Sequence, residues 1–443
     1  MGAIGGSLGA AVVRYCCIDF HKLNGDERSK NYSTAQTLIS IASGIYLLLA
    51  LCSIFYLELF LNVEEKYLFE VYCLVVTSVI SFVLGLNESL FTSVFSAKGK
   101  VYLISLLSIL YNIVKFSILW IYLEEYNSLY FYCIVEGIIS ASKLVLAWWM
   151  FRLLKTGINI KLTWKLSIPT NGIVSMTIWG VVAGIGFSLF RKTELLLINN
   201  FISTEVAGYV AIIMVWSGLL VVIASQITSF LGSYLTPIFA IEGPETFNKS
   251  RVFFNRIAAA MSGTVAAIAL YHSSELLPLW ANTSAIKEYL IPHYWFLIGT
   301  SFILSQSVNM VTFTVLAKLK TFSLILCGFG ILYVLACYVL LQNGYGVKTI
   351  AIAYACVNFL LYQVLVSGLS ARYCNSKFDF VEIMIYIVSS SMLYIMFSVT
   401  GLNSSEFFLN LMLSVFVSLA FWVAFFFILI YMSKQKGVMP EIF

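Results

Sequence analysis

Ionisable side chains occur inside long apolar stretches of this sequence, where each charge needs a partner or water. Glu136, Ser140 and Lys143 are spaced i, i+4 and i+7, which puts all three on one face of a helix. Lys115 lies in the preceding apolar stretch at the same depth as Glu136, which predicts an ion pair between neighbouring helices. Such a pair either joins two helices or lines a cavity that opens and closes, and the sequence leaves both interpretations open.

A second group of charges, Arg191, Lys192 and Glu194, occurs in the outer part of a later apolar stretch. Arg191 and Glu194 are three residues apart and share a helix face. The apolar run "LLLI" at 195–198 predicts that the helix continues past Phe190, so that these charges line a central cavity. If the helix instead ends at Phe190, they are ordinary charges at the membrane surface.

Three further kinds of polar residue complete the candidate set. Glu88 is interpreted either as a proton- or cation-coupling site or as an acid that extends towards the membrane surface. Gln306 and Asn309 give the second half of the chain an uncharged polar patch. Asn112 lies in the same polar stripe as Lys115.

The elements that must position these side chains are membrane-spanning helices. The 443-residue sequence is 60% hydrophobic and 11% charged, against about 25% charged in a soluble domain. Runs of about 20 apolar residues, long enough to cross a bilayer as a helix, recur along the chain. The predicted spans are 36–62, 69–95, 101–123, 128–151, 171–198, 205–236, 254–282, 289–316, 321–342, 347–371, 382–401 and 405–432, with a partial span at 1–13. The predicted fold class is an all-α polytopic membrane protein.

Catalytic and metal-binding patterns do not emerge from the sequence. The nine cysteines include no CxxC pair and lie mostly inside predicted spans, which favours reduced packing residues. There is no phosphate-binding loop, no serine–histidine constellation and no metal-ligand cluster. We therefore expect neither an enzyme nor a bound metal or cofactor.

Lysine and arginine are unevenly divided between the loops. Nineteen of the 26 fall in loops on one side of the predicted spans, and only Lys66, Lys287 and Lys348 fall in loops on the other. By the positive-inside rule, the basic side, which includes the C-terminus, is cytoplasmic. The net charge of +5 follows from this topology and does not indicate nucleic-acid binding.

Short patterns recur about half the chain length apart. Ala97-Lys98 and Ala317-Lys318 both precede a long apolar run and are 220 residues apart, and "GSLGAAVVRYC" from Gly6 corresponds to "GSYLTPIFAIE" from Gly232. Six predicted spans separate equivalent points, so the copies would be parallel repeats. Chance similarity between apolar helices is the alternative.

The repeat predicts two six-helix lobes and a C-terminal addition. The N-terminal lobe is 1–155, the C-terminal lobe is 156–378, and two additional helices with a tail occupy 379–443. The same alignment puts roughly 50 residues, about one and a half helices, before Met1 in the complete protein. A truncated form, a misplaced start and a naturally shortened chain would each explain this.

Three stretches resemble the polysaccharide repeat-unit (O-antigen) flippases of the multidrug, oligosaccharidyl-lipid and polysaccharide exporter superfamily. They are "VVRYCCIDFHKLNGDERSKNYSTA", in which Arg14 matches a basic residue of that family, "LNESLFTSVFSAKGKVYLISLLSIL", and "FSLFRKTELLLINNFISTEVAGYVAIIMVW", which contains Gly208 and Tyr209. The resemblance implies alternating access between two lobes of a multi-pass protein of the bacterial inner membrane, with coupling to a proton or sodium gradient.

The resemblance also implies the substrate, an undecaprenyl-diphosphate-linked oligosaccharide whose lipid tail follows an outer face of the helices. Cations suited to its pyrophosphate are Arg191, Lys192, Lys115, Lys143 and Arg14. Groups suited to its sugars are Asn112, Gln306, Asn309, Tyr209 and Trp216, and the coupling or ion-pair acids are Glu88, Glu136 and Glu194. Other polysaccharide assembly proteins are the expected partners.

Three other functions remain open. A cation-coupled multidrug exporter of the same fold should favour cavity acids over bases. An integral-membrane glycosyltransferase or polymerase would need a sizeable catalytic loop, and the predicted outer loops are short. A non-transporting membrane scaffold is the third.

Overall fold

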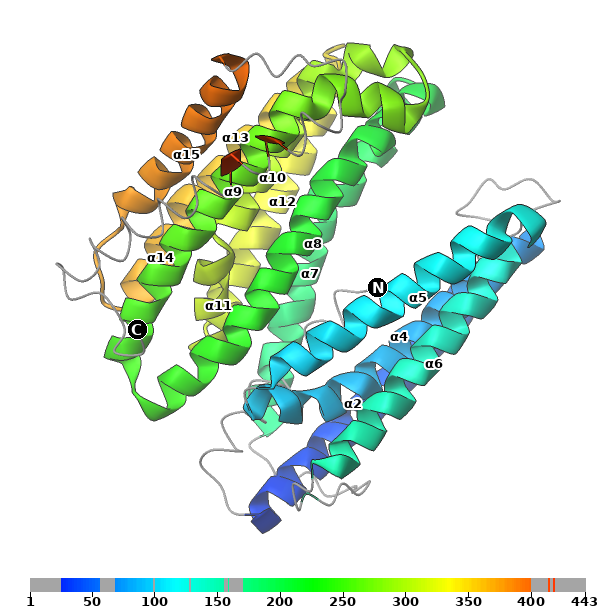
Figure 1. Cartoon of the computed structure of the whole chain (residues 1–443), viewed down its shortest axis with the longest axis vertical. Coiled ribbons are helices and arrows are strands. Elements are labelled where there is room, and N and C mark those ends of the chain that lie inside the picture. Colours follow the sequence, from blue (N-terminus) through cyan, green and yellow to red (C-terminus); the bar gives the residue numbers. More distant parts are fainter. Residues whose placement is uncertain are drawn as a thin grey trace. The chain divides into compact units, whose positions relative to one another are not determined.

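The computed structural model describes residues 25–55, 68–98, 100–126, 129–154, 158 and 170–399, and the pairs 413–414 and 417–418. Within these ranges all regular structure is helical (Figure 1). The chain forms two compact units, Met1–Val181 and Val182–Phe443. Their boundary falls inside helix α7 (Thr170–Phe201), whereas the sequence repeat placed the lobe boundary at 155/156.

The first unit contains helices α2 (Gly25–Phe55), α4 (Leu68–Ala97), α5 (Val101–Tyr126) and α6 (Leu129–Leu153). α4 packs against α2, α5 and α6. Tyr32 and Ile39 of α2 are buried together with Leu90 and Val94 of α4. Other large apolar side chains face outwards, such as Trp120, which is 75% exposed. Outward apolar side chains suit helices whose surroundings are lipid tails.

The second unit contains α8 (Thr204–Ile241), α9 (Pro244–Ala281), η2 (Ala285–Tyr289), α10 (Leu290–Ser305), α11 (Ser307–Val315), α12 (Leu319–Gln342), α13 (Val347–Asn358), η3 (Phe359–Val366), α14 (Ser367–Tyr373) and α15 (Phe380–Val399), as well as most of α7. α10 is its central helix, packed against α8, α9 and α13. Eleven of its 16 residues are buried. A helix covered on nearly all sides is a core helix.

Small residues let helices of this unit approach closely. A Cβ atom on Gly263 of α9 would overlap Ser389 Oγ of α15 and lie 2.7 Å from the backbone oxygen of Tyr386. A Cβ atom on Gly299 of α10 would lie 2.7 Å from Cδ1 of Tyr354 in α13. Side chains larger than glycine would push these helices apart, so glycine sets the α9–α15 and α10–α13 contacts.

Two predicted spans are interrupted. The span predicted at 289–316 is bent by 43° between α10 and α11, with Gln306 at the break. The span predicted at 347–371 contains the π-helix η3 between α13 and α14. Broken helices and π-helical turns recur at functional sites, because they free backbone and side-chain polar groups inside a membrane protein.

Within the described residues, the predicted spans from 36–62 to 382–401 coincide with helices or with consecutive helices of one span, and 56–62 and 400–401 lie outside the described residues. Eight described helices are long and apolar enough to cross a membrane, or nine if the bent α10–α11 pair is one span. α5 is outside this set because its apolar section, Leu106–Tyr122, is shorter, and α7 is outside it as well. The partial span at 1–13 and most of 405–432 lie outside the described residues. The chain is an all-α polytopic membrane protein.

Candidate functional site

A cavity of about 430 Å³ in the first unit is lined by α4 and α6. Its wall carries the carboxylates of Glu88 and Glu136 and the ammonium group of Lys143. Its hydroxyl-bearing residues are Thr77, Ser78, Ser81, Tyr132 and Ser140. The predicted common face of Glu136, Ser140 and Lys143 is confirmed, since all three line this cavity.

The predicted ion pair between Lys115 and Glu136 is also confirmed. Lys115 Nζ of α5 contacts Glu136 Oε2 of α6, and the two side chains are 25% and 27% exposed. Lys115 Nζ lies 3.4 Å from the hydroxyl oxygen of Tyr132 and 5.0 Å from its ring centroid. The pair joins α5 to α6 and, through Glu136, borders the cavity.

Glu88 and Lys143 form the second set of opposite charges in this cavity. They are close enough to interact electrostatically. Lys143 Nζ also lies 5.7 Å from the ring centroid of Tyr111 on α5, within the range of a cation–π interaction. Asn112, the next residue of α5, is exposed and does not line the cavity. The cavity wall therefore carries two acids and one base, and Lys115 pairs with one of the acids from outside the lining.

Two charged residues of α7, Arg191 and Glu194, interact with tyrosines of the second unit. α7 continues to Phe201, as predicted. Glu194 is 1% exposed and interacts electrostatically with Tyr333 and Tyr354. Arg191 is partly buried and also interacts with Tyr354. Glu194 is thus buried beside tyrosines of α12 and α13, and a central cavity lined by these charges stays a prediction.

The predicted aromatic contacts with sugar lie on α8, where both rings pack against other aromatic side chains. Tyr209 stacks on Tyr289 with ring centroids 5.3 Å apart. Trp216 meets Trp280 edge-on at 6.2 Å. Of the other predicted cations, Lys192 lies in α7 and Arg14 lies outside the described residues.

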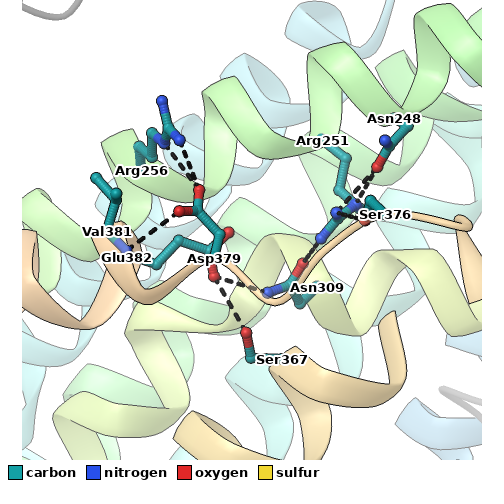
Figure 2. Close-up of polar contacts among 9 residues, drawn as sticks. All are labelled: Asn248, Arg251, Arg256, Asn309, Ser367, Ser376, Asp379, Val381 and Glu382. Carbon is teal, nitrogen blue, oxygen red and sulfur yellow. Dashed lines mark hydrogen bonds and ion pairs between the residues drawn. The ribbon is translucent and has the colours of Figure 1, made fainter. Parts of the chain in front are cut away.

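A buried polar network lies where α9, α11, α14 and the start of α15 meet (Figure 2). Arg251 of α9 is 2% exposed, and its Nη1 donates hydrogen bonds to Asn309 Oδ1 at 2.5 Å and to Ser370 Oγ at 3.2 Å. Its Nε and Nη2 donate to Asn248 Oδ1 at 3.1 and 2.9 Å, and Nη2 donates to Ser376 Oγ at 3.1 Å. These five hydrogen bonds all end on neutral groups.

The carboxylate of this network is Glu382, in the first turn of α15. Glu382 is 1% exposed. Its Oε2 accepts hydrogen bonds from Asn309 Nδ2 at 3.2 Å and from Ser367 Oγ at 3.3 Å (Figure 2). The amide of Asn309 thus accepts from the guanidinium of Arg251 and donates to the carboxylate, which links a buried cation to a buried acid.

A direct ion pair lies beside this bridge. Arg256 of α9 donates from Nε and Nη2 to Asp379 Oδ2 at 3.0 and 2.7 Å, and the two side chains are 11% and 16% exposed. Asp379 Oδ1 accepts from the backbone N–H of Val381 at 3.1 Å. The pair fixes the start of α15 to α9 with charge-assisted hydrogen bonds.

The network extends to both interrupted spans. Asn309 Nδ2 donates to Gln306 Oε1 at 2.6 Å, and Gln306 Nε2 donates to Gln363 Oε1 of η3 at 3.1 Å. Gln363 Nε2 then donates to Ser305 Oγ at 2.6 Å. Gln306 and Asn309 are fully buried. Their amides hydrogen-bond to other side chains of the second unit in this structure, and their contact with a sugar stays a prediction.

Sequence reasoning missed the two charged members of the bridge. Arg251 precedes the predicted span 254–282 and was therefore assigned to a cytoplasmic loop, but α9 already begins at Pro244. The Gly243-Pro244 pair was the available signal, since proline is common in the first turn of a helix. Glu382 is the first residue of its predicted span, a position equally typical of an exposed acid.

Comparison with known proteins gives a match in fold but not in sequence. No protein-family model matches the chain, and no curated protein matches it. A MATE structure in complex with MaL6 matches with a TM-score of 0.69 and 11% identity, over 85% of this chain and 86% of that one. A mutant of the Vibrio cholerae MATE transporter VcmN matches with a TM-score of 0.67 and 13% identity, over 86% of each chain.

The lipid II flippase MurJ, in an inward closed conformation, also matches. Its TM-score is 0.63 at 14% identity, over 96% of this chain and 90% of that one. At such identities the shared property is the fold. The chain has the fold of MATE transporters and of MurJ.

Proposed function

We propose that this protein is a flippase that moves undecaprenyl-diphosphate-linked oligosaccharide repeat units across the bacterial inner membrane, for O-antigen or other surface-polysaccharide assembly. The proposed mechanism is alternating access, in which two repeat lobes expose the substrate site first to one side of the membrane and then to the other. The process breaks no covalent bond, so we propose a transporter and not an enzyme.

The observation that supports a lipid-linked substrate is the extent of the structural match. The match with MurJ, described as a lipid II flippase, covers 96% of this chain, whereas the two MATE matches cover 85% and 86%. The alignment with MurJ thus includes more of this chain, whereas the TM-scores of the two MATE structures are higher, 0.69 and 0.67 against 0.63. An alignment of that extent favours a lipid-linked substrate over a drug-sized one.

The cavity of the first unit supplies groups that suit the polar part of such a substrate. Lys143 lines it, and Lys115 is paired with Glu136, which also lines it. We propose that the pyrophosphate replaces Glu136 and Glu88 as the partner of these two lysines, since ammonium groups bind phosphate well. Serine and threonine hydroxyls of the wall would then bond to the sugar.

Further contacts are proposed besides those of this cavity. We keep as proposed contacts along the transport path the cations Arg191, Lys192 and Arg14 and the neutral groups Asn112, Tyr209 and Trp216. Other polysaccharide assembly proteins are proposed to act on the same lipid-linked substrate before and after it crosses the membrane.

A cation-coupled multidrug exporter is the second candidate. The observation that favours it is the presence of two carboxylates, Glu88 and Glu136, in the same cavity. Carboxylates in a membrane cavity attract organic cations, protons or sodium ions. The fold is equally that of MATE transporters.

Deletion of the gene in its own organism separates these candidates. The lipid-linked oligosaccharide is quantified in inverted and right-side-out membrane vesicles by its accessibility to a glycosidase, and susceptibility to cationic dyes is measured in parallel. The flippase predicts that the oligosaccharide accumulates on the cytoplasmic leaflet, that surface polysaccharide is lost, and that dye susceptibility is unchanged. Unchanged polysaccharide with raised dye susceptibility would favour the exporter, and loss of the lipid-linked oligosaccharide itself would favour an enzyme.

A further inference from the structure

The second unit contains a buried acid whose hydrogen bonding is incomplete. Glu382 is 1% exposed, and both of its accepted hydrogen bonds end on Oε2. Oε1 has no hydrogen-bond partner among the described residues. A buried carboxylate with a bare oxygen is costly, because an ionised group removed from water needs hydrogen bonds to most of its lone pairs.

The charged groups around Glu382 come from the elements packed against it. α9 contributes Arg251 and Arg256, and the segment before α15 contributes Asp379. α11 and α14 contribute only the neutral side chains of Asn309 and Ser367. Asp379 is bound to Arg256, so Arg251 is the cation that compensates the negative charge of Glu382. The side-chain amide of Asn309 lies between the two groups.

We propose that Glu382 is a proton-binding site, which takes up one proton on Oε1 and releases it again, and that its occupancy controls the Asn309 bridge. The ionised carboxylate accepts a strong hydrogen bond from Asn309 Nδ2 and so orients the amide oxygen towards Arg251. The protonated acid is a weaker acceptor. It loosens the link between α15 and α11, while Arg251 keeps its other neutral partners.

The ligand is a proton and not a metal cation because of the charge already present. Arg251 and Arg256 put two guanidinium groups in the surroundings of Glu382, and a metal ion would add a further positive charge. The amide oxygens of Asn309 and Gln306 are already occupied as acceptors. A proton needs one free carboxylate oxygen, which Oε1 provides.

The position of Glu382 connects its protonation to the hydrogen bonds of other helices in this unit. From Asn309 the hydrogen bonds continue to Gln306, at the bend between α10 and α11, and to Gln363, in η3. These are the two irregular points of the spans in this unit. A change in the hydrogen bond at Glu382 would therefore be transmitted to the two places where regular α-helical hydrogen bonding is interrupted.

The first test uses wild-type protein in native membranes and needs no transported substrate. Dicyclohexylcarbodiimide, an apolar reagent that attacks protonated carboxyl groups, is applied between pH 5 and 9, and the modified residues are identified by mass spectrometry. Labelling of Glu382 should rise by up to about tenfold for each unit by which pH falls, for as long as the group is mostly ionised. Absence of labelling at Glu382 at every pH, or labelling that does not change with pH, would overturn the proposal.

The second test asks whether the proton controls the docking of α15. Protection factors of the backbone amides from 376 to 390 are measured by hydrogen exchange over the same pH range in wild type, in Glu382→Gln and in Glu245→Gln, a control that changes an exposed acid of α9. Protection in wild type and Glu245→Gln should fall as pH falls. Glu382→Gln, which is always uncharged, should have the low-pH protection factors of wild type at every pH. The same pH response in Glu382→Gln as in wild type would refute the proposal.

Proton coupling of transport rests on the proposed function, whereas the proton site does not. With purified protein in proteoliposomes, a pH gradient should accelerate lipid-linked oligosaccharide transport by wild type and by Glu245→Gln. It should have no effect on Glu382→Gln. Failure of all three proteins to transport would count against the proposed function alone, because both proton tests are made without substrate.

Discussion

Lys115 touches Glu136 directly, whereas Arg251 reaches Glu382 through the amide of Asn309. The direct pair is partly exposed and lies beside a cavity, and the bridged pair is buried. A direct contact can be exchanged for an anionic ligand without loss of the fold. A bridged pair is more sensitive, since one neutral side chain determines whether two buried charges are balanced.

Lys115→Ala should show how far the direct pair stabilises the first unit. It leaves Glu136 without its cation, and we expect a loss of about 1–3 kcal/mol in the free energy of unfolding. The double variant Lys115→Ala/Glu136→Ala should recover part of this loss. Thermal unfolding of the purified protein, read by tryptophan fluorescence, measures both. The matched control is Lys249→Ala, which removes an exposed i, i+4 pair with Glu245 and should cost no more than about 0.5 kcal/mol.

Asn309→Leu should lower the free energy of unfolding by more than a substitution at the edge of the same network does. It removes the group that joins Arg251 and Glu382 and leaves both charges buried without a link, for which we expect a loss of about 2–4 kcal/mol. Ser376→Ala removes one hydrogen bond of Arg251 and should cost about 1 kcal/mol. Denaturant unfolding of the two variants gives the comparison, and equal losses would show that the bridge is dispensable.

At the scale of elements, the α9–α15 contact connects the start of α15 to the rest of the second unit. The two helices lie side by side in Figure 1 and make the most extensive helix–helix contact among the described residues. The polar network secures one end of the contact, and apolar residues such as Ala267, Leu393 and Phe397 fill the other. Gly263 lies between these ends, at the closest approach.

Gly263→Ala should therefore weaken the docking of α15. The added methyl group meets Ser389 and the backbone of Tyr386, and overpacking of this kind costs about 1–3 kcal/mol. Limited proteolysis between 374 and 380 should be faster than in wild type. Gly328→Ala in α12 is the control, because a Cβ atom there has no neighbour within 4 Å. A Gly263→Ala protein that resists proteolysis like wild type would contradict this account of the contact.

Helix positions were largely predictable from the sequence, but interruptions inside helices were not. Apolar runs locate spans because the length of such a run reports directly on membrane thickness. Nothing at Gln306 distinguishes a bend, since neither proline nor glycine is present there. That bend depends on partners such as Gln363, 57 residues away in sequence.

The part of the candidate site that depends on spacing within one helix could be predicted, and the part that joins different helices could not. The face shared by Glu136, Ser140 and Lys143 follows from helical spacing, and so does the depth match with Lys115. The bridge from Arg251 to Glu382 joins residues 131 positions apart through a third helix, and its asparagine looks like any polar residue in a span. Spacing along one helix reports on a face, but it does not report which helix covers that face.

At the scale of the whole molecule, each unit contains its own set of compensated charges. The first unit places them around a cavity, and the second places them in its interior. The proposed alternating access would move one lobe relative to the other, and under that proposal charges in both lobes should affect export.

Export is therefore expected to depend on cations in both units. Lys115→Ala and Arg191→Ala should each reduce surface polysaccharide several-fold while the protein remains inserted in the membrane. Immunoblots of membrane fractions report insertion, and polysaccharide gels report export. The control is Lys249→Ala, whose exposed side chain contacts Glu245 within its own helix. Normal polysaccharide in both test variants would show that these cations do not contact the substrate.

The π-helix η3 sets the direction in which the next helix of its span faces. A π-helix closes its hydrogen bonds between residues i and i+5, whereas an α-helix closes them between i and i+4 and turns the chain by about 100° per residue. Deleting one residue from 359–366 would therefore rotate α14 about its axis by roughly 100° relative to α13. Ser367 and Ser370 would then turn away from Glu382 and Arg251 together, although no loop had moved. The residue count of η3 is thus part of what brings the serines of α14 to the buried charges.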